Sequence, residues 1–127
     1  MAAVKAYKSG AKTAFGNIKV SREWNWCEEQ VKYLNRFTEK DPQDFILSNG
    51  KAYSAQKMLN FAFGYFKLDY KKFVIYEKKL SRKKDFRLKR SNYSYCLSRN
   101  NMSRKPKIYG KKLIHTLIKH YLNEKKN

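Results

Sequence analysis

Arg22 is the first residue whose type and surroundings indicate chemistry. A guanidinium group can donate two parallel hydrogen bonds to the oxygens of a phosphate or diphosphate. Arg22 lies in the string FGNIKVSREWNW at residues 15–26, where a short strand and a turn lead to the arginine and an aromatic pair. This arrangement is suitable for an anionic ligand, although an arginine beside tryptophan is also typical of a packed surface pair. The pattern alone therefore makes Arg22 a candidate anion ligand and no more.

The other reactive residue types form no complete catalytic centre in the sequence. His115 and His120 are five residues apart, so on one helix they project about 140° from each other and cannot act as an i, i+4 metal-binding pair. We expect two surface histidines and no metal site. Cys27 and Cys96 form no CxxC pair, which favours two buried, reduced thiols. No segment matches GxGxxG, GxxxxGK[ST] or a nucleophile elbow.

The charge of the chain points to an anionic partner. Thirty Lys and Arg against ten Asp and Glu give a formal net charge of +20. The basic segment from Lys78 to Lys112 holds fourteen of these cations and one acid, Asp85, so its net charge is 14 minus 1, or +13. Its aromatic residues could stack on bases or anchor the segment to the core. Nucleic acid bound through this segment is therefore one alternative, and a solvated basic surface is the other.

The length and hydropathy of the chain set limits on its organisation. A chain of 127 residues fits a single domain with one core, and 42% apolar residues exceed what a disordered polyelectrolyte carries. No apolar run approaches the roughly 20 residues that cross a bilayer, so we expect no membrane contact. The start MAAVKAYKSG lacks the continuous apolar core of a secretory signal, which favours the cytoplasm.

The elements expected in the first third of the chain surround Arg22. A short helix over Ala2 to Lys8 ends at Ser9 and Gly10, and Thr13 to Asn17 is expected to form a short strand. The next segment reads as a loop that leads into a helix capped by Asn25. Apolar residues recur on one face of that helix: Cys27, Val31, Leu34 and Phe37.

The middle and end of the chain alternate strands and helices. Residues Asp44 to Ser48 and Lys72 to Glu77 have the composition of buried strands, and the first is followed by a turn at Asn49 and Gly50. Between them, a helix capped by Ser54 carries the clearest apolar stripe: Ala55, Met58, Leu59, Ala62, Phe63 and Phe66. This order predicts an α/β fold in which the two strands pair in parallel through a right-handed crossover. A last helix is expected after Gly110, with one apolar side formed by Leu113, Ile114, Leu117, Ile118, Tyr121 and Leu122.

Several ordered motifs together resemble one family. FGNIKVSREWNW at 15–26, DFILSNGKAYS at 44–54 and FAFGYFKLDYKKFVIYEKKLSRKKD at 61–85 resemble the C-terminal part of GDP-mannose 4,6-dehydratases, which are extended short-chain dehydrogenases acting on sugar nucleotides. The family pattern has Gly-Asn-x-x-x-x-Arg-Asp/Glu-Trp-Gly, then a strand, an aromatic-rich helix and an Arg-Pro-x-Glu/Asp element. Residues 15–85 follow this pattern almost without gaps, whereas 2–14 and 86–122 follow it loosely.

The resemblance implies a fold and a set of ligand-binding residues. It implies a single truncated domain over residues 1–127, the C-terminal portion of an extended Rossmann-type sugar-nucleotide dehydratase without its cofactor-binding half. In such enzymes the Rossmann half carries NADP and the catalytic residues, and the C-terminal part closes over the GDP moiety. By this resemblance Arg22 and Arg82 contact the nucleotide and Asp85 meets the ribose. The chain itself would hold no cofactor and no catalytic residue.

The sequence also departs from the family pattern. Asn25 stands where the family has glycine, Lys83 where it has proline, and Gln30 where it has an aromatic residue. These changes loosen the expected ligand shelf. They are consistent with a drifting truncated product, or with a subunit completed by a separate Rossmann-containing chain or by another copy. We expect a lyase-family fragment in GDP-fucose biosynthesis that binds a GDP-sugar and is inactive alone; the alternative is a small basic nucleic-acid-binding protein.

Overall fold

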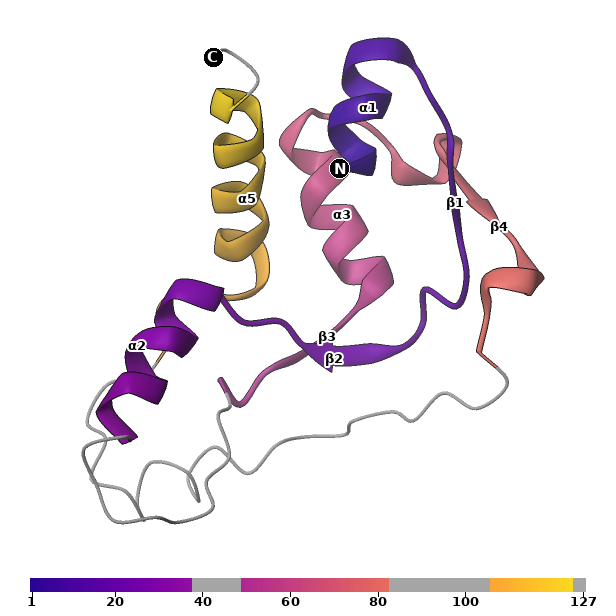
Figure 1. The fold of residues 1–127 in the computed structure, drawn as a ribbon. Coiled ribbons are helices and arrows are strands. Elements are labelled where there is room, and N and C mark those ends of the chain that lie inside the picture. Colours follow the sequence, from indigo (N-terminus) through magenta and orange to yellow (C-terminus); the bar gives the residue numbers. More distant parts are fainter. Residues whose placement is uncertain (38–48, 83–105, 125–127) are drawn as a thin grey trace.

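The computed structural model describes residues 1–37, 49–82 and 106–124, and these form a small α/β domain (Figure 1). Three helices, α1, α3 and α5, enclose the apolar core, and two small sheets lie beside and below them (Figure 1). The expected strand at 44–48 and the middle of the basic segment lie outside the described residues.

Helix α1 spans Ala2–Ser9 and buries Ala3, Val4 and Ala6. It ends where the sequence predicts, because Gly10 adopts a left-handed conformation at φ 67°. The N–H of Gly10 donates to the Ala6 carbonyl at 2.9 Å and so satisfies one of the terminal carbonyl groups of the helix.

The first sheet pairs β1 (Thr13–Phe15) with β4 (Val74–Tyr76) in parallel, with Ala14 opposite Ile75. The strands expected at 13–17 and 72–77 are therefore present, but each is shorter. The expected burial of the second is wrong, because Ile75 is 45% and Tyr76 62% exposed. Because consecutive side chains of a strand point to opposite faces, both faces of β4 are at least partly open to solvent. The partner that the structure gives to β4 is β1, at the start of the chain.

The second sheet pairs β2 (Ser21–Glu23) with β3 (Ala52–Ser54) in antiparallel fashion, with Arg22 opposite Tyr53. Residues 21–23 belong to the segment that was expected to form a loop before α2, and this prediction is wrong. Ser-Arg-Glu has no alternation of apolar residues, so no local pattern marks it as a strand. Strand β2 forms because it pairs with β3, which lies about thirty residues further along the chain.

Helix α3 (Ala55–Tyr65) forms the centre of the core. Ser54 caps it as predicted, since its Oγ accepts from the Lys57 N–H at 3.1 Å. The predicted stripe faces inward, and Phe63 is buried together with Met58, Leu59 and Ala62. The end of the helix leads through two short 3₁₀ turns, η1 (Tyr70–Lys72) and η2 (Lys78–Leu80), which flank β4.

Helix α5 (Gly110–Glu124) packs along α3 and adds Leu113, Ile114 and Ile118 to the core, as predicted. The prediction is wrong for Leu117, which is 37% exposed. Gly110 begins the helix with φ 55°, and a Cβ there would come within 2.8 Å of the Tyr53 ring. A side chain at this position would therefore require the Tyr53 ring to shift.

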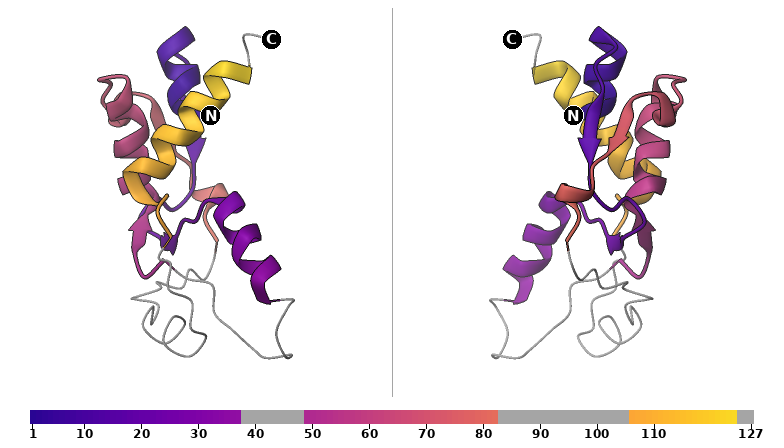
Figure 2. Two further views of the ribbon diagram at one scale, coloured as in Figure 1. Left: turned by 90° about the vertical axis from the view of Figure 1, so that its left-hand side faces the viewer. Right: turned by 90° about the vertical axis from the view of Figure 1, so that its right-hand side faces the viewer.

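Helix α2 (Cys27–Phe37) stands apart from α1, α3 and α5 (Figure 2). It begins at Cys27, so Trp26 and not the expected Asn25 precedes it. The Asn25 Oδ1 instead accepts from the Asn49 Nδ2 at 2.5 Å. On the expected apolar face Val31 is 47% and Leu34 44% exposed, and Cys27 is also exposed. The prediction of a buried thiol is wrong for Cys27, and Cys96 lies outside the described residues.

Candidate functional site

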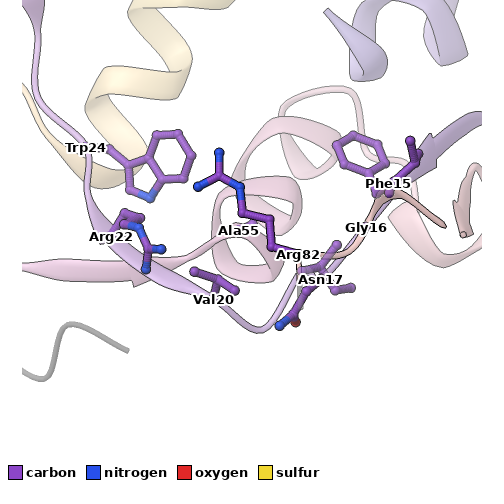
Figure 3. Close-up of a pocket in the computed structure, with 10 residues that line it drawn as sticks. Phe15, Gly16, Asn17, Val20, Arg22, Trp24, Ala55 and Arg82 are labelled. Carbon is purple, nitrogen blue, oxygen red and sulfur yellow. The ribbon is translucent and has the colours of Figure 1, made fainter. Parts of the chain in front are cut away.

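A basic pocket of about 290 Å³ opens where the turn after β1, strand β2 and the segment after β4 meet (Figure 3). We call it the arginine pocket. Its described lining contains two arginines and no carboxylate, with apolar and small residues around them: Phe15, Gly16, Asn17, Ile18, Val20, Arg22, Trp24, Ala55, Leu80 and Arg82.

Arg22 reaches the pocket from the middle of β2. Its position is fixed by the pairing with β3, and its Nη1 donates to the Ser21 carbonyl at 2.8 Å. The side chain is half-buried, so part of the guanidinium is shielded from water. The neighbouring Glu23 does not line the pocket, and its Oε2 accepts from the Asn49 N–H at 3.0 Å. The carboxylate nearest to Arg22 in sequence is therefore bonded outside the pocket.

Arg82 reaches the pocket from the segment that follows η2. This segment passes so close to the turn after β1 that a Cβ on Gly16 would overlap the Leu80 carbonyl oxygen and stand 2.7 Å from the carbonyl carbon. Only glycine allows this approach. In Figure 3 the Arg82 side chain extends past Ala55 toward Trp24 and Arg22. Gly16 thus determines where Arg82 enters the pocket.

Trp24 forms an aromatic wall at the upper end of the pocket in Figure 3. Its Nε1 donates to the Tyr53 carbonyl at 3.0 Å, which fixes the indole against β3. The ring remains 38% exposed and can contact a ligand. The turn below is held by Asn17, whose Oδ1 accepts from the Lys19 N–H at 3.0 Å. The pocket therefore combines a fixed aromatic surface with two cations.

Of the three residues proposed as ligand contacts, two come together. Arg22 and Arg82 line the same pocket, although 60 residues separate them in the sequence (82 minus 22). Asp85 lies outside the described residues. The role of Gly16 was not predicted from the sequence. The pair Gly16-Asn17 indicates a turn, but nothing in the sequence shows that the segment around Leu80 packs against this turn.

The remaining reactive residues form no second site in the part of the chain that is described. No three His, Cys, Asp or Glu side chains gather there as metal ligands would. His120 is exposed as predicted, but His115 is half-buried and its ring meets Tyr65 edge-on at 4.9 Å. Burial lowers the pKa of His115, and the nearby Lys111 and Lys119 lower it further. The prediction of two surface histidines is therefore wrong for His115.

Within residues 1–37, 49–82 and 106–124, no helix has both the length and the apolarity needed to span a membrane.

Comparison with known proteins identifies the family. Residues 1–109 match the family model for GDP-mannose 4,6 dehydratase. The chain belongs to the GDP-mannose 4,6-dehydratase family. The matched range contains Arg22, Arg82 and Asp85. The resemblance seen in the sequence motifs is therefore confirmed at the level of the family.

Two relatives show how much of such a protein this chain covers. It is 35% identical to GDP-mannose 4,6 dehydratase 2 of Caenorhabditis elegans over 49 residues, which are 38% of this chain and 13% of that protein. It is 23% identical to GDP-mannose 4,6 dehydratase 1 of Arabidopsis thaliana over 108 residues, 84% of this chain and 29% of that protein. The chain thus spans less than a third of the length of either relative.

Proposed function

We propose that this chain is the substrate-side part of a GDP-mannose 4,6-dehydratase and that the arginine pocket binds the diphosphate of a GDP-sugar. In this proposal the α/β domain corresponds to the C-terminal portion of an extended Rossmann-type enzyme. The observation that carries it is the meeting of Arg22 and Arg82 in one pocket free of described carboxylates. Two segments far apart in the sequence supply these cations, as expected if the fold exists to bring them together.

The chemistry of the pocket suits a diphosphate. Two guanidinium groups can donate several charge-assisted hydrogen bonds to its oxygens, and such bonds are about twice as strong as neutral ones. Bringing two cations together also costs repulsion, which an anion between them relieves. A pocket of about 290 Å³ is at the lower end of the usual range for ligands. It therefore suits the diphosphate and one adjoining ring, and the exposed Trp24 offers a face for that ring.

We further propose that the chain needs a Rossmann half for catalysis. The dehydratase reaction requires NADP, and the 127 residues contain no glycine-rich loop of the type that binds a dinucleotide phosphate. The NADP site and the catalytic residues would have to come from a Rossmann-containing part outside these 127 residues, such as a separate chain. Incubating the purified chain with GDP-mannose and NADP tests this dependence. We expect no turnover, and dehydration by the chain alone would contradict the proposal.

Isothermal titration with GDP tests the binding proposal. We expect heat of binding for the wild type and at least a tenfold weaker affinity for the Arg22→Ala/Arg82→Ala double variant. Lys8→Ala is the control, because it also removes surface charge but lies in the last turn of α1 and does not line the pocket. Binding that is absent at millimolar GDP, or equal in the double variant and the wild type, would refute the proposed site.

A second candidate function is nucleic-acid binding through the basic segment from Lys78 to Lys112, and its charge of +13 favours it. In this case the affinity should fall steeply as salt rises, because each neutralised phosphate releases counterions. A gel-shift series with mixed RNA and DNA at 50 and 200 mM salt distinguishes the two functions. A shift that is absent or insensitive to salt would exclude the second.

A further inference from the structure

A second pocket adjoins the arginine pocket and has the opposite chemistry. It has a volume of about 250 Å³, and every described side chain that lines it is apolar. Four alanines form much of its wall, Ala2 and Ala3 from the start of α1 and Ala55 and Ala62 from α3. Because alanine has no side-chain atom beyond Cβ, these helices leave room between them. We call this space the apolar pocket.

The two pockets share a wall. Phe15, Trp24 and Ala55 line both, so a ligand that lies over these three residues reaches from the arginines into the apolar space. The deep side of the apolar pocket is formed by core residues such as Met58 and Ile114. A cationic entrance joined to an apolar interior matches a molecule with an anionic head and a hydrocarbon tail.

We propose that the joined pockets bind a phosphate- or diphosphate-headed amphiphile, with the head on Arg22 and Arg82 and the tail in the apolar pocket. The one polar side-chain group in the described lining, the Trp24 N–H, already donates to the Tyr53 carbonyl, so a nucleobase would lose its hydrogen bonds there. A hydrocarbon has none to lose and gains from leaving water. A water molecule occupies about 30 Å³ in the liquid, so a pocket of about 250 Å³ has room for roughly eight groups of that size.

This inference goes beyond the proposed GDP-sugar site and shares with it the two arginines and the common wall that contains Trp24. Geranyl diphosphate, with ten carbons, is a suitable probe, and inorganic diphosphate is the matched head without a tail. Both are titrated calorimetrically at concentrations below micelle formation. We expect geranyl diphosphate to bind at least tenfold more tightly than inorganic diphosphate, because burying its tail adds to the head-group interaction.

Filling the apolar pocket provides the decisive variant. Ala2→Leu adds a side chain to the pocket from a half-buried position, and Ala11→Leu adds the same volume at a half-buried position outside it. Circular dichroism verifies that both fold. Ala2→Leu should weaken geranyl diphosphate at least tenfold and change the affinities for inorganic diphosphate and GDP less than twofold, whereas Ala11→Leu should change none of them.

Two results would overturn the inference. One is an affinity for geranyl diphosphate less than tenfold above that for inorganic diphosphate. The other is an Ala2→Leu variant whose affinities for geranyl diphosphate and inorganic diphosphate both equal those of the wild type, or both fall by the same factor. Failure of GDP to bind while geranyl diphosphate binds as described would refute the proposed function and leave this inference standing, so the two can be judged separately.

Discussion

Replacing Gly16 by alanine should displace Arg82 without touching its side chain. The new Cβ would lie 2.7 Å from the Leu80 carbonyl carbon and overlap the carbonyl oxygen. Carbon atoms in normal contact are at least about 3.5 Å apart, so the segment carrying Arg82 must move by roughly 1 Å. Overpacking of this kind costs about 1–3 kcal/mol of stability. A loss of similar size should appear in ligand binding, because Arg82 follows Leu80 by only two residues.

Calorimetric titration with GDP measures that effect. Loss of a hydrogen bond to a charged group costs about 1.5–3 kcal/mol, so Gly16→Ala should weaken GDP binding by roughly tenfold to a hundredfold. If the substitution acts through Arg82, the double variant Gly16→Ala/Arg82→Ala should bind within twofold of Arg82→Ala alone. Additive losses in the double variant would refute this reasoning, and so would wild-type affinity in Gly16→Ala.

Gly64→Ala is the control for a glycine replacement as such. A Cβ at Gly64 has no neighbour within 4 Å, and the residue lies inside α3. Alanine should therefore stabilise the protein by about 0.5–1 kcal/mol and leave GDP binding unchanged. Thermal unfolding followed by circular dichroism separates this gain from the loss expected for Gly16→Ala.

Two further predictions concern groups outside the pocket. Because the pKa of His115 is lowered in the fold, the unfolded chain binds protons more tightly than the folded chain. The urea concentration at the midpoint of unfolding should therefore fall as the pH drops below about 6.5. His115→Leu should reduce this fall, while His120→Leu should preserve it. The Glu29 carboxylate accepts from the N–H groups of Lys107 and Ile108 at 3.0 and 3.1 Å, so Glu29→Ala should speed hydrogen exchange of these two amides at least tenfold. Glu28→Ala should not, because the described contacts of Glu28 are with Trp26 and Lys32. Equal exchange rates in the two variants would show that the Glu29 carboxylate does not protect these amides.

The helices of this fold were predictable because their signals are local. The stripe of α3 and its Ser54 cap, the Gly10 stop of α1 and the inward face of α5 each follow from residues within a few turns of one another. The family pattern over residues 15–85 can also be read from the sequence, and the resemblance was enough to name Arg22 and Arg82 as candidate ligand contacts. For these elements the tertiary structure agrees with what the neighbouring residues favour.

The errors arose where distant segments decide the structure. Strand β2 exists because β3 lies beside it, and the sequence Ser-Arg-Glu gives no sign of that partner. The exposure of Cys27 and of Ile75 depends on which elements cover α2 and β4, which periodicity does not specify. The partial burial of His115 comes from Tyr65 on another helix. The approach of Leu80 to Gly16 likewise joins segments more than sixty residues apart (80 minus 16).

The proposed site requires Arg22 and Arg82 to contact the same ligand, and the NMR signals of the two guanidinium groups measure this directly. In ¹H–¹⁵N spectra the Nε–Hε peaks of Arg22 and Arg82 can be assigned from the Arg22→Lys and Arg82→Lys variants. During a GDP titration we predict that both peaks shift along curves with the same Kd. If either peak stays in place at saturating GDP, the arginines do not share the ligand and the proposed site is wrong.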